Sequence, residues 1–333
     1  MIKPTAVYQR KKLQQYNSWI LFIKPNFKQM LWGGNRLKSD FSYEIPNDHT
    51  GECWAVSAHP NGDCQIYTIW GNSPYDGRLL SDLWQNQKEL FGGLPGDQFP
   101  ILLKIIDAKA DLSIQVHPND SYAGIHEDGS LGKTECWLIL DCDEDAQIVV
   151  GHNARTKEEL VQMIEEKRWE DLICKKSIQP GDFFQIEPGM VHAIKAGTLI
   201  LEIQQSSDIT YRLYDYDRNE NGITRELHQS KSMDVITCPS RELSDCRELS
   251  RQHLAKGVFK EKLVRCLYYD VDRIVIKGSY VFSQQEPFTI LCILKGEGMI
   301  DGISIKKGDF FILPSGYGEY ALTGTLEVIK VVS

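Results

Sequence analysis

The sequence lacks the features that mark membrane-spanning, secreted and nucleic-acid-binding proteins. No apolar run approaches the roughly 18 residues that suggest a membrane span. Residues 19–23 are apolar and follow a basic start at residues 1–16, but a signal peptide needs an apolar region of about seven residues or more. Basic residues are outnumbered, with 37 Lys and Arg against 46 Asp and Glu, and the net charge of −9 argues against a nucleic-acid or anionic-membrane surface.

The sequence also lacks a pattern of paired cysteines. Its nine cysteines are an odd number and include no C-x-x-C pair, which argues against a disulfide framework and a cysteine-based zinc site. We therefore predict reduced cysteines and a cytoplasmic protein. The nine positions are Cys53, Cys64, Cys136, Cys142, Cys174, Cys238, Cys246, Cys266 and Cys292.

Short segments of β type dominate the chain. Gly, Pro, Asn and Asp separate them at short intervals, as in a β-sandwich or β-barrel. At 333 residues the chain is long enough for more than one domain. The predicted strands cover residues 19–23, 53–58, 65–67, 101–107, 113–117, 135–140, 147–150, 183–186, 199–213, 267–271, 273–276, 288–294, 298–300, 310–313 and 326–332.

Two segments carry helical patterns instead. Thr156 and Glu159 form a capping box, and apolar residues then recur at roughly helical spacing as far as residue 172. Residues 79–91 carry a similar pattern. We interpret both segments as packing elements. The polar stretch at residues 218–249 is predicted to be a loop-rich connection between two halves.

An internal repeat supports these two halves. Residues 181–192 (GDFFQIEPGMVH) align without gaps with residues 308–319 (GDFFILPSGYGE). A Gly-Asp turn, a short strand and a second glycine turn are typical of a hairpin in a small β-barrel; chance similarity of two Gly-Asp turns is the alternative. In this register His192 aligns with Glu319. His192 is a candidate metal ligand. We therefore predict that only the first barrel binds a metal ion, so that each chain holds one.

The most informative stretch is residues 113–118, which read SIQVHP. Side chains in a strand alternate faces, so Ser113, Gln115 and His117 project to one face and the two aliphatic residues between them project to the other. A polar face backed by aliphatic residues is typical of the lining of a site.

Glu135 and His192 complete a candidate metal site with this strand. Zinc accepts imidazole nitrogen and carboxylate oxygen, and a catalytic site keeps one position for water or substrate. His117, Glu135 and His192 would make a set of two histidines and one carboxylate. The carboxamide of Gln115 would add a weak neutral donor. We interpret the other histidines as structural, and leave His59 open because it lies at the end of the predicted strand at 52–60.

If residues 200–212 form a single strand, one face of that strand is polar and the other is mostly apolar. The even positions after residue 200 are polar and include Glu202, Asp208 and Arg212. This face either meets solvent or lines a barrel wide enough to hold a ligand. The position of the segment shortly after His192 favours the second alternative.

Three cations accompany the candidate ligands. Lys133 shares a face with Glu135, Lys104 interrupts the apolar run 101–106, and Arg212 closes the polar face. A lysine within an apolar run must either extend its amine to solvent or meet an anion. In a chain of net charge −9, three such cations predict an anionic substrate such as a phosphate ester. The alternative is that each cation pairs with a nearby acid.

Together these residues resemble type I mannose-6-phosphate isomerase in its short bacterial form, a member of the cupin superfamily. The matching blocks follow the family order over much of the N-terminal two-thirds, and the repeat at residue 308 extends the match. The blocks are residues 51–60 (GECWAVSAHP), 102–109 (LLKIIDAK), 112–118 (LSIQVHP), 132–137 (GKTECW), 181–194 and 201–212.

The resemblance implies a mainly β fold of two cupin-type (jelly-roll) β-barrels with a small helical insertion. It implies a catalytic domain at residues 1–217 that includes both helical segments, a connection at 218–249 and a degenerate barrel at 250–333. The implied reaction interconverts mannose 6-phosphate and fructose 6-phosphate through an enediol. Two other classes stay open: a non-catalytic phosphosugar sensor, and an iron-dependent cupin oxygenase, whose closely spaced H-x-H is absent here.

The resemblance also implies a role for each candidate site residue. The implied ligands of a single zinc ion are Gln115, His117, Glu135 and His192. The implied substrate contacts are Trp32, Glu52, Lys104 and Ser113. The candidates for acid–base catalysis and charge stabilisation are Lys133, Glu202, Asp208 and Arg212.

Overall fold

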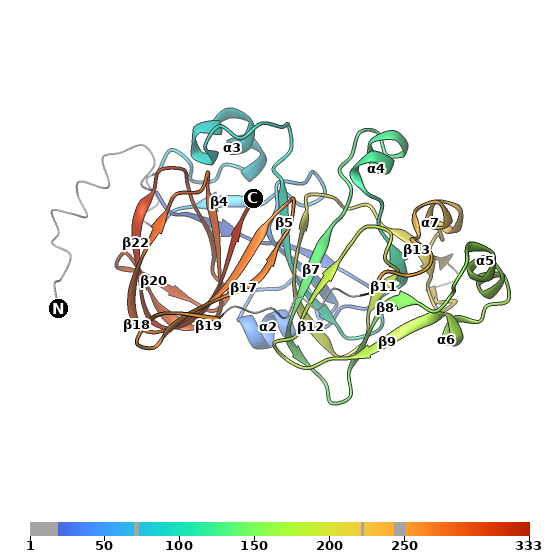
Figure 1. The fold of residues 1–333 in the computed structure, drawn as a ribbon. Helices are drawn as coiled ribbons and strands as arrows, with labels where there is room; N and C mark the ends of the chain where they lie inside the picture. Colours follow the sequence, from blue (N-terminus) through green and yellow to red (C-terminus); the bar gives the residue numbers. More distant parts are fainter. Residues whose placement is uncertain (1–18, 70–72, 221–222, 243–250) are drawn as a thin grey trace. The chain divides into compact units, whose positions relative to one another are not determined.

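The computed structural model describes residues 19–69, 73–220, 223–242 and 251–333 (Figure 1). The basic start at residues 1–16 and Cys246 lie outside these residues. Strands dominate the described chain, which confirms the mainly β fold class. The described chain divides into two compact units, of which unit 1 comprises residues 19–26, 55–69, 73–101 and 251–333, and unit 2 comprises residues 27–54, 102–220 and 223–242. Because each unit combines separate segments, the continuous domains at 1–217 and 250–333 stay a prediction about where function resides.

Unit 1 is built on one nine-stranded sheet. Its strands are β1 (Leu21–Lys24), β4 (Gln65–Tyr67), β16 (Arg251–Ala255), β17 (Val258–Arg265), β18 (Asp270–Gln284), β19 (Thr289–Ile300), β20 (Ile303–Lys306), β21 (Phe310–Leu313) and β22 (Gly318–Val332). They lie in the order β16-β17-β18-β22-β19-β21-β1-β4, and β20 pairs with β19. The predicted strand at 19–23 therefore exists as β1, paired between β21 and β4.

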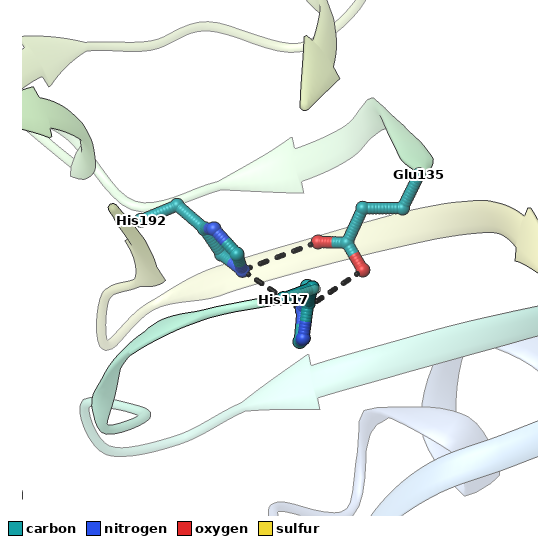
Figure 2. Close-up of side chains that lie close together, drawn as sticks. All are labelled: His117, Glu135 and His192. Atoms are coloured by element: carbon teal, nitrogen blue, oxygen red, sulfur yellow. Dashed lines mark hydrogen bonds and ion pairs between the residues drawn. The ribbon is translucent and has the colours of Figure 1, made fainter. Parts of the chain in front are cut away.

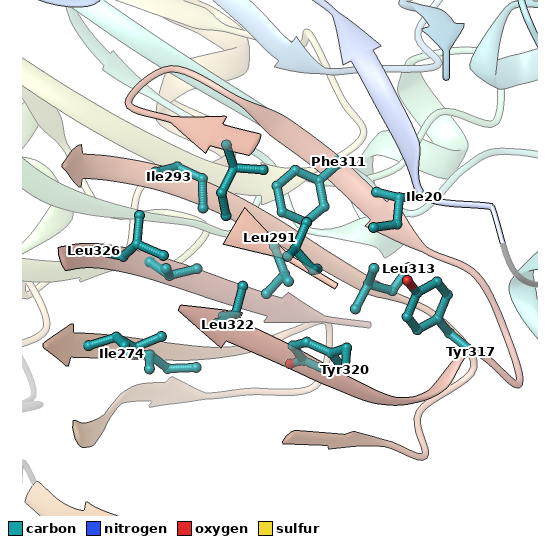
Figure 3. Packing of buried hydrophobic residues seen from close by; sticks show 14 of the residues in the cluster. Ile20, Ile274, Leu291, Ile293, Phe311, Leu313, Tyr317, Tyr320, Leu322 and Leu326 are labelled. Atoms are coloured by element: carbon teal, nitrogen blue, oxygen red, sulfur yellow. The ribbon is translucent and has the colours of Figure 1, made fainter. Parts of the chain in front are cut away.

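One face of this sheet forms the core of unit 1 (Figure 3). Ile274 of β18, Leu291 of β19 and Leu322 of β22 are among the buried residues that pack there. Phe22 of β1 packs its ring against Phe311 of β21, with 5.0 Å between the ring centroids. These contacts join an N-terminal strand to strands near the other end of the chain.

Unit 2 holds most of two larger sheets and one short hairpin. The six-stranded sheet, here sheet B, has β2 (Asn26–Gln29), β3 (Thr50–Val56), β5 (Ile101–Ala108), β7 (Glu135–Cys142), β10 (Phe183–Ile186) and β12 (Thr198–Gln205). The five-stranded sheet, here sheet C, has β6 (Ile114–Val116), β8 (Gln147–His152), β9 (Ile173–Ser177), β11 (His192–Ile194) and β13 (Tyr211–Tyr214). The hairpin pairs β14 (Asn219–Glu220) with β15 (Ile223–Thr224).

Sheets B and C pack face to face. One hydrophobic core contains Trp137 of β7 and Ile200 of β12 from sheet B, together with Ile148 of β8 and Ile194 of β11 from sheet C. Two sheets around one core form the layered β architecture of a jelly roll. The structure therefore agrees with the predicted cupin-type fold.

Helical elements cover the other face of sheet C. Ile114 and Val116 of β6 pack there in one cluster with Leu160 and Trp169. The aliphatic residues of the 113–118 stretch thus project away from its polar residues, as predicted. The capping box is confirmed at Thr156, whose side chain accepts a hydrogen bond from the backbone N–H of Glu159 at 3.2 Å.

The structure corrects the lengths of both predicted helices. Residues 79–91 form α3 (Leu80–Asn86) and the 3-10 turn η1 (Lys88–Phe91), and both belong to unit 1. Residues 156–172 form α5 (Lys157–Glu165) and α6 (Trp169–Leu172), separated at Lys167, whose φ is +54°. Three further helices have no signal among the predicted segments: α2 (Arg36–Phe41), α4 (Asp120–His126) and α7 (Gln229–Val235).

The predicted strand at 199–213 is wrong as one element. It consists of β12 in sheet B and β13 in sheet C, and residues 206–210 between them belong to no strand. The predicted strand at 267–271 is also displaced, since β18 begins at Asp270 and the side chain of Leu267 is 88% exposed.

The repeat is confirmed by equivalent hydrogen bonds. Asp182 and Asp309 each accept from the backbone N–H three residues earlier, at 3.0 and 2.8 Å. The glycines before them, Gly181 and Gly308, have φ values of +94° and +92°. These left-handed conformations favour glycine because it has no Cβ. The two hairpins therefore share their turn chemistry as well as their sequence.

The sequence predicts neither a membrane-spanning segment nor a disulfide framework. Among the described residues, no helix is both long enough and apolar enough to cross a membrane. None of the eight cysteines in the described part of the chain forms a disulfide, which agrees with the prediction of reduced cysteines.

Candidate metal centre and active site

Three of the predicted ligands, His117, Glu135 and His192, converge in unit 2 with their donor atoms within 4.8 Å of one another (Figure 2). Nε2 of His117 lies 3.1 Å from Nε2 of His192. The carboxylate of Glu135 places Oε2 3.4 Å from the first of these nitrogens and Oε1 3.4 Å from the second. All three side chains are at most 1% exposed. We call these residues the metal group.

The protonation states of the metal group suit a cation. Nδ1 of His117 lies 2.9 Å from the carbonyl oxygen of Ile209, and Nδ1 of His192 lies 2.8 Å from that of Met190. A carbonyl only accepts, so each Nδ1 donates and each Nε2 presents a lone pair. Burial, together with the cation of Lys133, lowers the pKa of His117 to about 3, and burial also lowers the pKa of His192.

The carboxylate of the metal group is ionised. Burial would raise the pKa of Glu135, but Lys133 and the two histidines outweigh this effect and hold the pKa well below its ordinary value. Neutral imidazoles and an ionised carboxylate are the forms that ligate metals.

An ion would also resolve two unfavourable features of the metal group. The lone pairs of His117 and His192 face each other at 3.1 Å and repel. Oε1 of Glu135 accepts no hydrogen bond from the described residues, and Oε2 is balanced only by the amine of Lys133. A buried acceptor without a donor is costly, whereas a divalent cation satisfies all three groups. Two imidazoles and one carboxylate also fit the ligand preference of zinc and leave a coordination position open.

Strand pairing explains how these distant residues meet. His192 of β11 pairs with Gln115 of β6, which in turn pairs with Arg212 of β13. Paired residues on neighbouring antiparallel strands share a face, so these three form a row across sheet C. Glu135 begins β7 of the facing sheet B. Both sheets therefore contribute to the metal group.

Two predicted residues contact the metal group from the side. The carboxamide of Gln115 places Nε2 3.4 Å from Nε2 of His192, and a half-turn of the amide brings Oε1 to the same place. Nζ of Lys133 lies 2.8 Å from Oε2 of Glu135 and 3.2 Å from Nε2 of His117. Both residues also line the adjoining cavity.

This cavity has a volume of about 290 Å³, and the remaining predicted site residues line it. A volume of this order holds a small ligand. The predicted residues that line it are Trp32, Glu52, Lys104, Ser113, Gln115, Lys133, Glu202, Asp208 and Arg212. With the three residues of the metal group, the structure thus brings every predicted site residue to one place. Their individual roles stay predictions.

Lys104 lies between two carboxylates at this cavity. Its Nζ is 3.7 Å from Oε2 of Glu52 and 3.5 Å from Oε1 of Glu202. Burial alone would lower the pKa of Lys104, but the two carboxylates outweigh it and raise the pKa, so the amine stays charged. Burial raises the pKa of Glu202. The lysine within the apolar run therefore meets anions and does not extend to solvent.

Arg225 lines the same cavity and was not predicted. It follows β15 in the segment at 218–249, which was predicted to be a connection. No motif surrounds it, so the only signal was the group of Arg and Asp residues between Arg212 and Arg225.

The fold and the site together define a cupin-type protein with a buried metal-binding group. A model of the catalytic domain of type I phosphomannose isomerase matches residues 20–131, and a model of the mannose-6-phosphate isomerase cupin domain matches residues 260–333. Mannose-6-phosphate isomerase ManA of Bacillus subtilis is 49% identical over 314 residues, which cover 93% of this chain and 97% of that protein. The chain therefore belongs to the type I phosphomannose isomerase family, a family of isomerases.

Other relatives agree with this membership. A mannose-6-phosphate isomerase of Streptococcus mutans is 42% identical over 93% of this chain and 96% of its own length. The crystal structure of mannose 6-phosphate isomerase from Bacillus subtilis has a TM-score of 0.89 at 43% identity, covering 95% of this chain and 100% of that one. A putative mannosephosphate isomerase from Archaeoglobus fulgidus shares the fold, with a TM-score of 0.73 at 19% identity over 94% and 98% of the two chains.

Proposed function

We propose that this protein is a zinc-dependent, cytoplasmic isomerase that interconverts mannose 6-phosphate and fructose 6-phosphate. The observation that carries the proposal is the buried metal group, which adjoins a cavity lined by several cations. The family membership supports the same substrate, since the relatives are named for it.

His117, Glu135 and His192 would hold the ion, with Gln115 as the proposed fourth ligand. When bound, zinc supplies Lewis acidity toward substrate oxygens. The repeat places Glu319 where His192 would be required, which supports one metal per chain. We accordingly place the catalytic machinery within residues 1–217 and assign residues 250–333 to a degenerate barrel.

The proposed reaction moves a proton between C2 and C1 of the sugar. A base removes the C2 proton of the aldose, the resulting enediol receives a proton at C1, and one hydroxyl proton passes from O2 to O1. Lys133, Glu202 and Asp208 line the cavity and are the candidates for this base. Burial raises the pKa of Glu202, which suits a carboxyl that accepts and returns a proton. Arg212 would stabilise negative charge on the enediol or bind phosphate.

The first test measures turnover by the purified, zinc-loaded protein. We expect it to form fructose 6-phosphate from mannose 6-phosphate in a coupled assay, and to run the reaction in reverse. Binding of mannose 6-phosphate without any turnover would refute the proposal and favour the phosphosugar sensor. Reconstitution with iron in place of zinc distinguishes the oxygenase, which would consume oxygen.

The second test identifies the base. We expect Lys133→Ala to lower kcat by about 100-fold or more, since general base catalysis contributes roughly 10²- to 10⁴-fold. Metal content is measured in parallel because Lys133 contacts Glu135. If Lys133→Ala only raises KM and leaves kcat unaltered, Lys133 binds substrate and is not the base. Glu202→Gln and Asp208→Asn, measured in the same way, would then decide between the carboxylates.

A further inference from the structure

Two side chains, Asp120 and Gln205, hold the backbone on both sides of Lys133. Oδ1 of Asp120 accepts a hydrogen bond from the backbone N–H of Gly132 at 2.7 Å. Oε1 of Gln205, which is 3% exposed, accepts one from the backbone N–H of Thr134 at 2.9 Å. The two side chains also bind each other, since Nε2 of Gln205 donates to Oδ1 of Asp120 at 2.9 Å. We call Asp120 and Gln205 the loop clamp.

The clamped loop packs tightly against the start of α4. A Cβ at Gly132 would lie 2.4 Å from backbone atoms of both Asn119 and Asp120, so only glycine allows this approach. Asn119 caps the helix, because its side chain accepts from the backbone N–H of Tyr122 at 2.9 Å. Asp120 therefore occupies a fixed place in the first turn of α4, with the loop directly against it.

The loop clamp joins segments that carry the metal group. Asp120 lies three residues after His117 in the chain, and Gln205 ends β12 beside the start of β7, where Glu135 lies. Lys133 lies between the two clamped backbone groups. Its Nζ is 2.8 Å from Oε2 of Glu135 and 3.2 Å from Nε2 of His117. A shift of the loop would therefore move an amine and a carboxylate of the site together.

We propose that Asp120 and Gln205 are positioning residues, which hold Lys133 and Glu135 in place for metal binding and for turnover. Neither side chain is among the described residues that line the cavity, so both act through the backbone of residues 132–134. The effect on turnover rests on the proposed function, whereas the effect on metal binding does not. Partners that orient a metal ligand are worth about 10- to 100-fold in metal affinity or activity.

The direction of these hydrogen bonds provides a specific test. Gln205→Glu replaces the amide donor with a second carboxylate, which faces the carboxylate of Asp120 and repels it. Adding Asp120→Asn to the same chain restores a donor for this contact. In that double variant the exchanged side chains still accept from the N–H groups of Gly132 and Thr134. Asp120→Asn alone keeps an oxygen for both of its donors, so it should have a smaller effect than Gln205→Glu.

The first measurement is the zinc affinity of the purified protein, determined by competition with a chromophoric chelator. We expect Gln205→Glu to weaken zinc binding by about 10-fold or more, and the double variant to recover to within about threefold of the unaltered protein. In turnover assays Gln205→Glu should lower kcat by about 10- to 100-fold and change KM far less, because misplacing a catalytic group affects the reaction more than substrate binding. The double variant should recover kcat as well.

Gln284→Glu is the matched control. Gln284 is 4% exposed in unit 1, and its Nε2 donates to the backbone oxygen of Glu286 at 2.6 Å. The control therefore also puts a charge in place of a buried amide donor. It should lower the free energy of unfolding, measured by urea denaturation, and leave zinc affinity and kcat unaltered. Equal losses of zinc affinity in Gln284→Glu and Gln205→Glu would overturn the proposal, since general destabilisation would then explain both.

Unaltered zinc affinity and kcat in Gln205→Glu would also overturn it, as would a folded double variant that binds zinc no better than Gln205→Glu. If Gln205→Glu does not fold, Gln205→Ala replaces it, since this variant removes both contacts without adding a charge. Unaltered zinc affinity in Gln205→Ala would then refute the proposal. A protein whose zinc affinity follows the expected order but which never isomerises the sugar would refute the proposed function and support the loop clamp.

Discussion

Glu135→Gln is expected to lower isomerase activity by at least about 100-fold and to abolish stoichiometric metal binding, because it removes the only anionic ligand of the metal group. His117 and His192 would then supply two neutral imidazoles, and the new amide N–H₂ would compete for their lone pairs. His192→Ala should have the same effect, since it removes one of the two Nε2 donors. Activity and metal per chain, measured by elemental analysis, check the result.

A buried histidine outside the metal group provides the control for these variants. Nε2 of His152 lies 3.0 Å from the backbone oxygen of Thr237, so His152→Gln should keep its metal and its activity. Chelation of the unaltered protein should remove activity, and zinc should restore it. Full activity of Glu135→Gln after chelator treatment would show that the metal has no part in the reaction.

Lys104→Met is expected to destabilise the protein by about 3–5 kcal/mol, the usual cost of removing one partner from a buried ionic group. The substitution leaves the carboxylates of Glu52 and Glu202 buried without the amine that lies 3.7 and 3.5 Å from them. Urea denaturation measures the change in the free energy of unfolding, and the melting temperature should fall by roughly 10 °C.

Lys28→Met is the matched control for Lys104→Met. The amines of Lys28 and Lys104 lie 4.9 and 5.0 Å from the ring centroid of Trp54, so both substitutions remove a cation from the same ring. Loss of that contact alone should cost about 1 kcal/mol or less. Equal destabilisation by the two substitutions would show that the carboxylates do not depend on Lys104.

The stability defect of Lys104→Met should also depend on pH. Burial already raises the pKa of Glu202, and Lys104 opposes that rise, so its removal raises the pKa further. The folded variant then binds more protons than the unfolded chain between the two pKa values, and its stability falls as pH rises through that window. The defect should therefore be smaller at about pH 5 than at about pH 8. A defect that is the same at both pH values would contradict this account.

Local sequence patterns predicted the site residues correctly where those residues belong to a single strand. The alternation at residues 113–117 placed Ser113, Gln115 and His117 on one face, because successive side chains of a strand project to opposite faces in any environment. The same reasoning placed Glu202, Asp208 and Arg212 on one face, and all three line the cavity, but it wrongly assigned residues 199–213 to one strand. The chain leaves sheet B after Gln205 and enters sheet C at Tyr211, and alternation has no meaning across the irregular residues between them.

By itself, the sequence determined the residue types of the site, its polar faces and its internal repeat, because these depend on neighbours along the chain. Only the tertiary structure decided which groups meet. It places Nε2 of His117 within 3.1 Å of Nε2 of His192, which is 75 residues away, and it brings Arg225 to the cavity. The physical reason is that pairing between strands distant in the sequence sets these distances, and no local pattern encodes the register of such pairs.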